Sequence, residues 1–557
     1  MAQTTTTPRL AEPARRPEGQ WAFDPGREPL NANERLKQED DGLHVRHRIE
    51  TVYAHEGFAS IPPDDLRGRM RWWGLYTQRR PGIDGGRTAT LEPHELDDEY
   101  FMLRVRCDGG TLTLAQLRTV AGISQEFGRD TADITDRQNV QLHWIRIEDV
   151  PEIWRRLESV GLTTQEACGD VPRVILGSPV AGVAADEIID GTPAVAAIRE
   201  RYIGDPAFSN LPRKFKTAVS GSPHHDVAHE INDVAFVGVV HPELGPGFDL
   251  WVGGALSTNP MLGKRLGAFV TLERVPEVWA GVAGVFRDYG YRRLRTRARL
   301  KFLLADWGTA LFRQVLETEY LGYALPDGPE PPPPPTGRRD HVGVHPQKDG
   351  RFYVGAAPTV GRVSGPVLTA LADLVEEAGS DRVQLTTEQK LVVLDVEGSR
   401  VDALVDGLES LGLHVRTAST FRRGTLACTG IEFCKLAIVE TKGRAAALIG
   451  ELEDRLPTFD QPITINLNGC PNSCARIQTA DIGLKGALAG GEEGYQVHLG
   501  GGLGLTSGLG KTLRGLRVPA AELPDYVERV TRRFDEQRTE GELFAQWVQR
   551  ADEEDLR

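Results

Sequence analysis

The chain has 557 residues, a formal net charge of −14 and 40% hydrophobic residues. One hydrophobic core stops growing well below this length, so about two to four domains are expected. The acidic balance argues against nucleic acid as the partner of the whole chain, and no apolar run approaches the roughly 20 residues of a membrane-spanning helix. The N-terminus is polar and shows no secretory signal. The six cysteines therefore predict metal-binding or catalytic thiols of a cytoplasmic enzyme rather than disulfides.

Two segments divide the chain. Residues 1–70 precede the first periodic pattern, and we interpret them as an N-terminal extension that either wraps across the two halves or is disordered. Residues 329–339 read PEPPPPPTGRR. A proline run favours a stiff, extended linker, because proline cannot continue a helix or a central strand. This linker separates two halves of comparable length.

The two halves begin with the same succession of elements. In each, a strand-like run and a glycine-containing turn lead to an apolar-periodic helix, a β-branched strand containing T-x-x-Q, and a second helix. The helices are expected at 113–127 and 366–378, and at about 150–160 and 400–411; the strands contain Thr135 to Gln138 and Thr386 to Gln389. Further on, Ala167-Cys168 parallels Ala427-Cys428. This order predicts a duplicated β-α-β-type unit.

Mixed helices and strands at this spacing predict an α+β or α/β protein. Beyond the repeats, strand-like runs occur at 234–240 and 248–254, and a helix is expected at 521–540. The basic run RRLRTRARLK at 292–301 alternates as a strand would if it pointed several cations to one side, toward a polyanion. A solvated helix or strand face is the alternative interpretation of this run.

Four of the cysteines form two close pairs. Cys428 and Cys434 have five residues between them, and Cys470 and Cys474 have three. Four thiolates suit either tetrahedral zinc or a 4Fe–4S cluster. The five-residue gap is wide for zinc, and the surrounding Gly, Asn and Thr offer backbone N–H groups to cluster sulfurs, so the cluster is favoured over zinc. A disulfide and inert buried cysteines are the remaining alternatives.

The motifs CTGIEFC and NGCPNSC resemble the cluster signature of the sulfite/nitrite reductase family, whose members contain sirohaem and a 4Fe–4S cluster. The resemblance extends from about residue 70 to 515 and includes the duplicated halves. It implies an α+β fold with two ferredoxin-like repeats at 71–165 and 340–420. It also implies two larger α/β sirohaem-binding domains at 166–328 and 421–557. The four paired cysteines would hold the cluster, and Cys474 would also ligate the sirohaem iron.

The family places two arginines and two lysines over the haem, where they bind the oxyanion. The matching residues here are Arg104, Arg173, Lys214 and Lys216. The residue pattern supports part of this assignment. Lys214 and Lys216 lie two apart and face the same way on an extended chain, although lysines protecting an edge strand would show the same spacing. Arg104 lies in an apolar strand-like run, where a charge needs a bound anion or a carboxylate.

Sirohaem carries eight carboxylates, and their burial requires many cationic and polar donors. The segment TDRQNVQLH at 135–143 resembles the family's sirohaem-contact strand. Its predicted donors share one face of that strand: Arg137, Gln141 and His143. A satisfied core histidine is the alternative for His143. The basic run also resembles a family segment near the cofactor carboxylates, through Arg297, Arg299 and Lys301.

Substrate and electron donor are less directly indicated. Tyr76 and Cys168 resemble a pair found in a bacterial subset of sulfite reductases, where it can become a Tyr–Cys thioether; a packed Tyr and a buried free Cys are the alternative. This pair favours sulfite, reduced to sulfide in sulfur assimilation, over nitrite, reduced to ammonia. The glycine-rich segment 498–512 is no P-loop, since Leu505 stands where that motif needs Gly. With no flavodoxin-like or nicotinamide-binding region, reduced ferredoxin is the expected donor, and an NADPH-using flavoprotein subunit is the alternative.

Overall fold

The computed structural model describes residues 31–335 and 339–557. The first 30 residues of the predicted extension and residues 336–338 of the predicted linker lie outside this part. Within it, no helix has both the length and the apolar character needed to cross a membrane. The described part of the extension, from residue 31, is ordered and packs against the first half. It contains four short helices: α1 (Ala32–Glu39), α2 (Val45–Arg48), α3 (Ala54–Glu56) and α4 (Pro63–Arg67).

The first repeat packs helices on one face of a sheet. Its helix α6 was expected at 113–127, and Thr113 caps it, accepting a hydrogen bond from the Gln116 backbone N–H. Apart from the short helix α5 of the first repeat, the second repeat contains the same elements in the same order, and the helices expected there are also confirmed. The first repeat comprises β1 (Leu75–Arg79), α5 (Pro93–Leu96), β2 (Asp97–Val105), β3 (Thr111–Thr113), α6 (Leu114–Phe127), β4 (Thr131–Ile134), β5 (Val140–Ile145) and α7 (Val150–Ser159). The second comprises β11 (Gly343–Pro346), β12 (Phe352–Ala356), β13 (Arg362–Ser364), α11 (Gly365–Glu377), β14 (Arg382–Leu385), β15 (Leu391–Val396) and α12 (Val401–Ser410).

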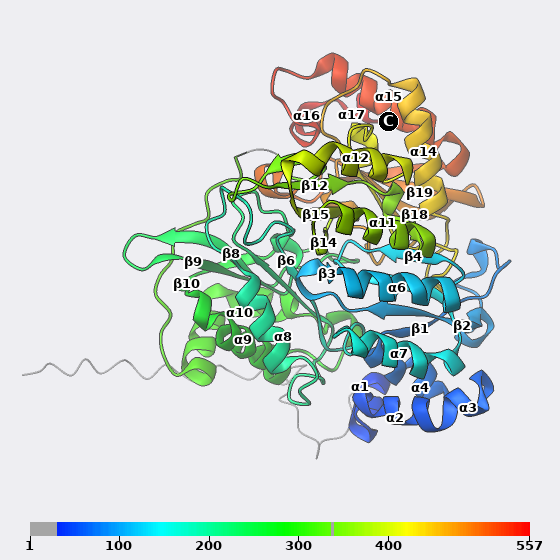
Figure 1. Cartoon of the computed structure of the whole chain (residues 1–557), viewed down its shortest axis with the longest axis vertical. Helices are drawn as coiled ribbons and strands as arrows, with labels where there is room; N and C mark the ends of the chain where they lie inside the picture. The colour runs from blue at the N-terminus through cyan, green and yellow to red at the C-terminus, as the bar shows by residue number, and fades with distance from the viewer. Residues whose placement is uncertain (1–30, 336–338) are drawn as a thin grey trace, which may run out of the picture.

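The two repeats exchange a strand. One sheet has the order β1-β2-β5-β4-β13 and the other β11-β12-β15-β14-β3, so each repeat completes the other's sheet. Helices α6 and α11 lie side by side between the halves (Figure 1). One hydrophobic core runs through both repeats and includes Leu112 of the exchanged strand β3 and Val363 of β13. The repeats therefore form one folded body.

Each repeat is followed by a larger α/β segment with its own core. The two sheets, β10-β9-β8-β7-β6 and β16-β17-β18-β19-β20, share one topology, in which the first three strands are parallel and the last two antiparallel. The first segment comprises β6 (Pro172–Gly177), α8 (Thr192–Tyr202), β7 (Phe215–Ser220), β8 (Val234–His241), β9 (Gly245–Val252), β10 (Lys264–Val270), α9 (Val275–Tyr289) and α10 (Leu300–Val315). The second comprises α13 (Thr420–Gly424), β16 (Thr425–Ala427), α14 (Lys442–Arg455), β17 (Ile465–Asn468), β18 (Ile482–Ala489), β19 (Glu492–Leu499), β20 (Lys511–Pro519), α15 (Leu523–Gln537), α16 (Phe544–Arg550) and α17 (Glu553–Leu556).

A glutamine joins each repeat to the segment that follows it. Gln138 donates to the Gly177 carbonyl at 2.8 Å and accepts from the Gly177 N–H at 3.0 Å. Gln389 makes the same pair of bonds with Ala427, at 2.9 and 3.1 Å. Gly177 ends β6 and Ala427 ends β16, so these two positions are equivalent.

This equivalence corrects one sequence-based alignment. Because Ala427 corresponds to Gly177, Cys428 corresponds to Ser178, and the predicted parallel with Ala167-Cys168 is wrong. A two-residue match in a loop carries less information than the register of a strand. The T-x-x-Q segments were also wrongly predicted as strands. They form the turns between β4 and β5 and between β14 and β15, where Gln138 and Gln389 have φ values of 53° and 56°.

The basic run at 292–301 is not a strand either. Arg295–Arg297 forms a short 3-10 helix and α10 begins at Leu300. The cations therefore point in different directions. Arg297 is exposed, whereas Arg299 and Lys301 are buried. A short 3-10 helix is followed here by the start of α10. The cations alternate along the sequence as they would in a strand, so their spacing alone does not distinguish the two structures.

Candidate active site

The two cysteine pairs meet at one edge of a sheet. Strands β16 and β17 are parallel neighbours, with Ala427 opposite Leu467. The C-terminal ends of parallel neighbours lie at the same edge, so the loops after them come together. Cys428 directly follows β16, and the loop carrying Cys470 and Cys474 follows β17. The Gly469 N–H donates to Cys428 Sγ at 3.2 Å, the kind of contact that stabilises a cluster thiolate.

All six cysteines are free thiols, and they differ in exposure. Burial raises the pKa of Cys428 to about 12 and also raises the pKa of Cys434, and the nearby Cys474 adds to both shifts. Cys474 itself is exposed. No group of three or more His, Cys, Asp or Glu side chains in the described ranges is placed to hold a single metal ion, and these four thiols are no exception.

The equivalent loops of the first half contain no cysteine. Ser178, Ser222 and Asp226 stand where Cys428, Cys470 and Cys474 stand in the second half. The loops keep their shape, since His225 and Ser473 have φ values of 52° and 56°. Asp226 instead accepts hydrogen bonds from the Ser178 and Ser220 hydroxyls at 2.7 and 2.9 Å, and His341 lies 3.2 Å away. A buried polar network fills this site, so the four-thiol arrangement occurs once in the part of the chain that the structure describes.

Cys474 opens into a cavity between the halves that is rich in cations. Lys214 and Lys216 both line it. The cavity is lined by Asp136, Arg137, Leu176, Lys214, Lys216, Ala228, Ile231, Asn232, Leu256, Ser257, Arg299, Asn472, Ser473, Cys474 and Arg476. Five of these side chains are cationic and one is a carboxylate, so the cavity suits a polyanion.

Asp233 holds two cationic residues of the cavity lining, Lys216 and Arg299, beside each other. Its carboxylate accepts from the Lys216 backbone N–H at 2.8 Å and from the Arg299 guanidinium, also at 2.8 Å. Lys216, the second residue of β7, therefore lines the cavity together with Arg299. Burial, together with Arg299 and Arg173, lowers the pKa of Lys214 to about 7, and burial lowers the pKa of Lys216 well below its ordinary value. A lysine with a pKa near neutral can both hold an anion and release a proton.

Several cationic atoms here have no partner. Arg137 Nε and Arg476 Nη1 are buried without a hydrogen-bond partner in the described part of the chain. Buried donors normally find an acceptor, and carboxylates would provide acceptors for these atoms. The side chains of the lining leave a cavity of about 30 Å³ between them. The donor set nevertheless fits a group with many carboxylates and a thiolate-ligated metal.

Four further predicted residues, Tyr76, Arg104, Cys168 and Arg173, lie close to one another outside the lining of this cavity. Arg104 Nη1 lies 2.7 Å from Cys168 Sγ. Burial opposes the charge of Arg104, yet Cys168, Tyr76 and Cys474 raise its pKa. Burial raises the pKa of Tyr76, and Cys168 raises it further. Arg173 donates to the Gly169 carbonyl at 3.0 Å, so the loop that carries Cys168 also holds this arginine.

The remaining predicted cofactor contacts lie in different surroundings. Gln141 is paired in register with Arg104 and shares its face of the sheet. His143 Nε2 lies 3.0 Å from Asp133, and its ring stacks on Phe433 at 3.8 Å. It is thus packed beside the residue that precedes Cys434, outside the cavity lining.

Of the basic run, only Arg299 lines the cavity. The Arg297 guanidinium carbon lies 5.2 Å from the centroid of the Phe302 ring. Lys301 donates to the Leu256 carbonyl at 3.0 Å and supports a loop of the lining from behind.

Sequence reasoning missed Arg476, Asp136 and Asp233. Arg476 follows Cys474 by two residues and has a φ of 59°, so its proximity to the motif was a usable signal. Asp233 is separated from Arg299 by 66 residues, and nothing in the local sequence indicates this ion pair.

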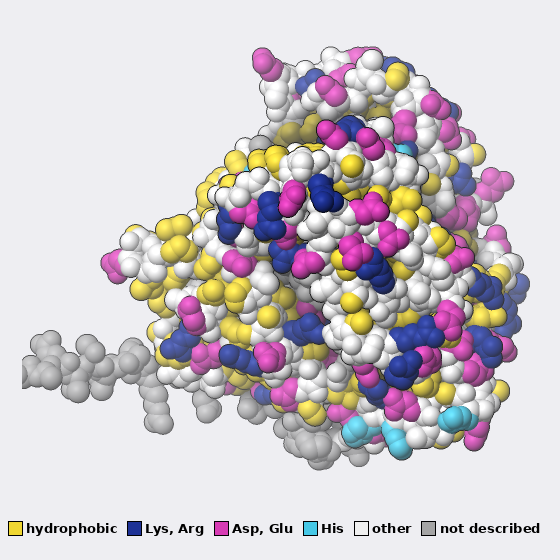
Figure 2. Space-filling model, in the orientation of Figure 1, with side chains coloured by type: hydrophobic (Ala, Val, Ile, Leu, Met, Phe, Trp, Pro, Cys, Tyr) yellow, Lys and Arg dark blue, Asp and Glu magenta, His cyan; other side chains and the backbone are white. Residues whose placement is uncertain are grey.

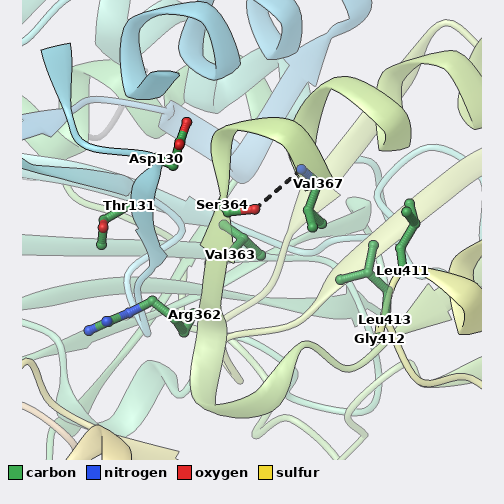
Figure 3. A pocket seen from close by; sticks show the side chains of 9 residues that line it. All are labelled: Asp130, Thr131, Arg362, Val363, Ser364, Val367, Leu411, Gly412 and Leu413. Carbon is green, nitrogen blue, oxygen red and sulfur yellow. Dashed lines mark hydrogen bonds between the residues drawn. The ribbon is translucent and has the colours of Figure 1, made fainter. Parts of the chain in front are cut away.

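A larger cavity of about 390 Å³ lies elsewhere, between the repeats (Figure 3). Its wall includes Val367, whose backbone N–H donates to the capping Ser364 hydroxyl at 3.3 Å. In the first repeat the equivalent residue is Gln116, which donates to the Val160 carbonyl at 3.0 Å and bridges this space. Valine has no side-chain amide, so Val367 does not make the corresponding bond in the second repeat. None of the predicted site residues lines this cavity.

Family comparisons agree with this architecture. Residues 94–160 and 345–411 match the "Nitrite/Sulfite reductase ferredoxin-like half domain", and residues 168–324 and 418–557 match the "Nitrite and sulphite reductase 4Fe-4S domain". The matches cover most of the chain. The chain therefore belongs to the nitrite and sulfite reductase family, as the cysteine motifs predicted.

Individual relatives narrow the comparison. The sulfite reductase (ferredoxin) of Mycobacterium tuberculosis is 61% identical over 557 residues, spanning 98% of this chain and 100% of the relative. The assimilatory ferredoxin-dependent nitrite reductase of Haloferax mediterranei is 37% identical, spanning 93% of this chain and 91% of the relative. The structure of the Mycobacterium tuberculosis NirA protein matches with a TM-score of 0.94 at 60% identity, covering 97% of this chain and 100% of that chain. These findings confirm the predicted fold class.

Proposed function

We propose that this chain is a ferredoxin-dependent sulfite reductase that takes sulfur from +4 in sulfite to −2 in sulfide, a six-electron reduction that serves sulfur assimilation. The observation that carries the proposal is the convergence of Cys474 with Lys214 and Lys216 on one cation-lined cavity. The full-length similarity to a sulfite reductase favours sulfite over nitrite as the substrate.

The cofactors are a 4Fe–4S cluster and sirohaem. Cys428, Cys434, Cys470 and Cys474 would hold the cluster, and Cys474, the exposed member, would also ligate the sirohaem iron. Such a pair of groups supplies electrons one at a time at an iron that binds the substrate. Among the predicted contacts, the cavity-lining Arg137 and Arg299 would pair with sirohaem carboxylates. Gln141, His143, Arg297 and Lys301, which are not part of the cavity lining, would act on the cofactor indirectly.

Four cations handle the oxyanion. Arg104 and Arg173 would each present a fixed fork of donors to sulfite oxygens, while Lys214 and Lys216 would act as mobile point charges. Lys214, with a pKa near 7, would also give a proton to an oxygen that leaves as water and be reprotonated from solvent. The main contribution of these four cations would be to stabilise the negative charge that develops on the departing oxygens.

Tyr76 and Cys168 form the proposed thioether. A bond between a tyrosine ring carbon and Cys168 Sγ releases two electrons and two protons, so its formation requires a two-electron oxidant such as dioxygen. Two observations support the bond. The charges of Cys168 and Arg104 both act on the pKa of Tyr76, and Arg104 Nη1 lies 2.7 Å from Cys168 Sγ. Mapping peptides of the purified protein tests it: a joined pair lighter by two hydrogen atoms is expected, and two separate unmodified peptides would contradict the bond.

Reduced ferredoxin is the proposed electron donor, with a flavoprotein subunit as the alternative. On the face shown in Figure 2, acidic and basic side chains are interspersed over the surface, so a docking site for an acidic ferredoxin would have to be a local feature. We place the enzyme in the cytoplasm, where reducing conditions keep cluster cysteines as thiols.

Spectra and kinetics test the function. The purified holoenzyme is expected to show haem bands with a cluster shoulder, and a colourless protein with stoichiometric zinc would contradict the proposal. With one reduced ferredoxin, kcat/KM for sulfite is then compared with kcat/KM for nitrite. A higher value for sulfite is expected; a higher value for nitrite would make the chain a ferredoxin-dependent nitrite reductase that forms ammonia.

A further inference from the structure

The described part of the N-terminal extension is anchored beside the substrate site. Asn31 caps α1 and donates to the Arg292 carbonyl at 2.6 Å, and Glu34 on the first turn of α1 pairs with the Arg292 guanidinium at 3.0 Å. Helix α1 is thereby fixed against the chain just before α10. This docking directs the last turn of α1, with Lys37, toward the loops of the substrate site.

Lys37 is buried and contacts, besides Glu34 of its own helix, two other segments of the chain. Its ammonium donates to the Leu211 carbonyl at 2.9 Å, pairs with Glu34 at 2.6 Å and lies 3.7 Å from Asp170. The side chain is only 2% exposed. Burying a lysine costs several kcal/mol unless its donors are satisfied, so these contacts must persist for α1 to remain docked.

Asp170 joins the two loops that carry the proposed oxyanion ligands. It lies between Cys168 and Arg173, and its carbonyl accepts from the Leu211 N–H at 2.9 Å, on the segment that leads to Lys214. Its carboxylate also forms an ion pair with Arg295, with Oδ1 at 2.7 Å from Nη2. Lys37 therefore contacts both loops at the point where they are bonded together.

The charged groups around Asp170 indicate that Lys37 supports the two loops rather than being needed to neutralise Asp170. Asp170 faces Arg295, Lys37 and, at 3.9 Å, Arg213. Removing Lys37 leaves the Asp170 carboxylate paired with Arg295, so this carboxylate keeps a cationic partner. The Leu211 carbonyl and Glu34 each lose a partner, and the two loops lose their shared support.

We propose that Lys37 is a positioning residue for the oxyanion site, holding loop 166–173 and segment 209–216 in register so that Arg173 and Lys214 present their charges together. This rests on the proposed function, because the site it positions is the oxyanion site. The extension thus completes the active site although none of its described residues lines the cavity.

The test compares holoenzyme variants, with rates expressed per haem. Lys37→Met is expected to raise KM for sulfite about tenfold with a smaller effect on kcat, because displaced cations bind the oxyanion less well. Lys37→Arg restores a charge with several donors and is expected to return KM most of the way. The matched control is Arg46→Met, which removes the pairing of the same extension with Glu158 of α7. It should lower the melting temperature and leave KM unchanged.

Hydrogen–deuterium exchange gives a readout independent of turnover. In Lys37→Met, faster exchange is expected in peptides covering 166–173 and 209–216, and Arg46→Met should leave those peptides protected. Unchanged KM with unchanged exchange in both peptides would overturn the proposal. If Lys37→Met yields no haem-loaded protein, Lys37→Gln keeps a donor for Leu211 and must show the same changes. A wild-type enzyme that fails to reduce sulfite would refute the proposed function, while the exchange data would still decide the role of Lys37.

Discussion

At the scale of single residues, the site is built from side chains whose ordinary chemistry is altered by burial. Lys214 and Lys216 are lysines with lowered pKa values, and Arg137 and Arg476 keep donors without partners. Each of these features is costly in a folded protein, and each is relieved by an anion. The cation-rich cavity is therefore the part of the molecule that a ligand should stabilise most.

The lowered pKa of Lys214 predicts a pH-dependent affinity. A protonated lysine binds anions, and with a pKa of about 7 Lys214 loses its charge as the pH rises above neutrality. Nitrite is a suitable probe, because its own charge does not change in this range. We expect its affinity for the oxidised holoenzyme, followed by haem absorption, to fall as the pH rises from about 6 to about 9. Lys214→Met should bind nitrite more weakly at the lower pH and show a flatter profile.

The control for this titration is Lys348→Met, since Lys348 is 54% exposed and pairs weakly with Glu187. It should keep the wild-type profile. Parallel profiles for wild type and Lys214→Met would show that another group titrates.

The cysteines predict a second change at this scale. Cys474→Ser is expected to abolish the coupling between haem and cluster and to reduce sulfite turnover to background, because serine is a poor ligand for both metal centres. Cys107→Ser alters a buried cysteine outside the two pairs; it should cost stability while leaving the spectra unchanged. Full activity with intact haem in Cys474→Ser would refute the bridging role.

At the scale of elements, the sequence predicted the helices, whose apolar residues recur at a regular spacing. It missed the features that depend on contacts between residues far apart in the chain. Helices α6 and α11 followed from apolar periodicity, because each buries one face in a common core. The turns holding Gln138 and Gln389 were predicted as strands, since β-branched residues flank them and the positive φ values are invisible in the sequence. The pairs Lys37–Asp170 and Asp233–Arg299 link residues far apart in the chain, and only the tertiary structure reveals them.

Gln138 and Gln389 make equivalent pairs of hydrogen bonds in the two halves, and this allows a paired experiment. Gln138→Leu and Gln389→Leu each leave a backbone N–H and carbonyl without their partner, so each should cost about 1–3 kcal/mol in the free energy of unfolding. Only Gln389 holds Ala427, the residue before Cys428. We therefore expect Gln389→Leu, and not Gln138→Leu, to lower the iron content of the purified protein. Equal iron loss in both variants would indicate general destabilisation instead.

At the scale of the whole molecule, duplication produced two similar halves with divided roles. The second half contributes the thiols, and the first contributes the lysines of the cation wall, so the cavity between them needs both. In the first half, a buried hydrogen-bond network of Asp226 with Ser178 and Ser220 fills the region equivalent to the thiols of the second half. The exchanged strands β3 and β13 fix the halves to each other, which keeps Cys474 opposite Lys214 and Lys216.

This exchange predicts that neither half folds alone. A chain of residues 339–557 retains all four paired cysteines, yet it loses β3 from the edge of its sheet and exposes its share of the common core. An unpaired strand beside exposed apolar surface favours aggregation. We expect this chain, produced alone, to aggregate without cooperative unfolding. Co-expression with residues 1–335 should instead give a paired complex with haem bands, because the strand exchange and the common core supply the contacts between the halves. A monomeric 339–557 that melts cooperatively and carries a cluster would show that the halves are independent domains.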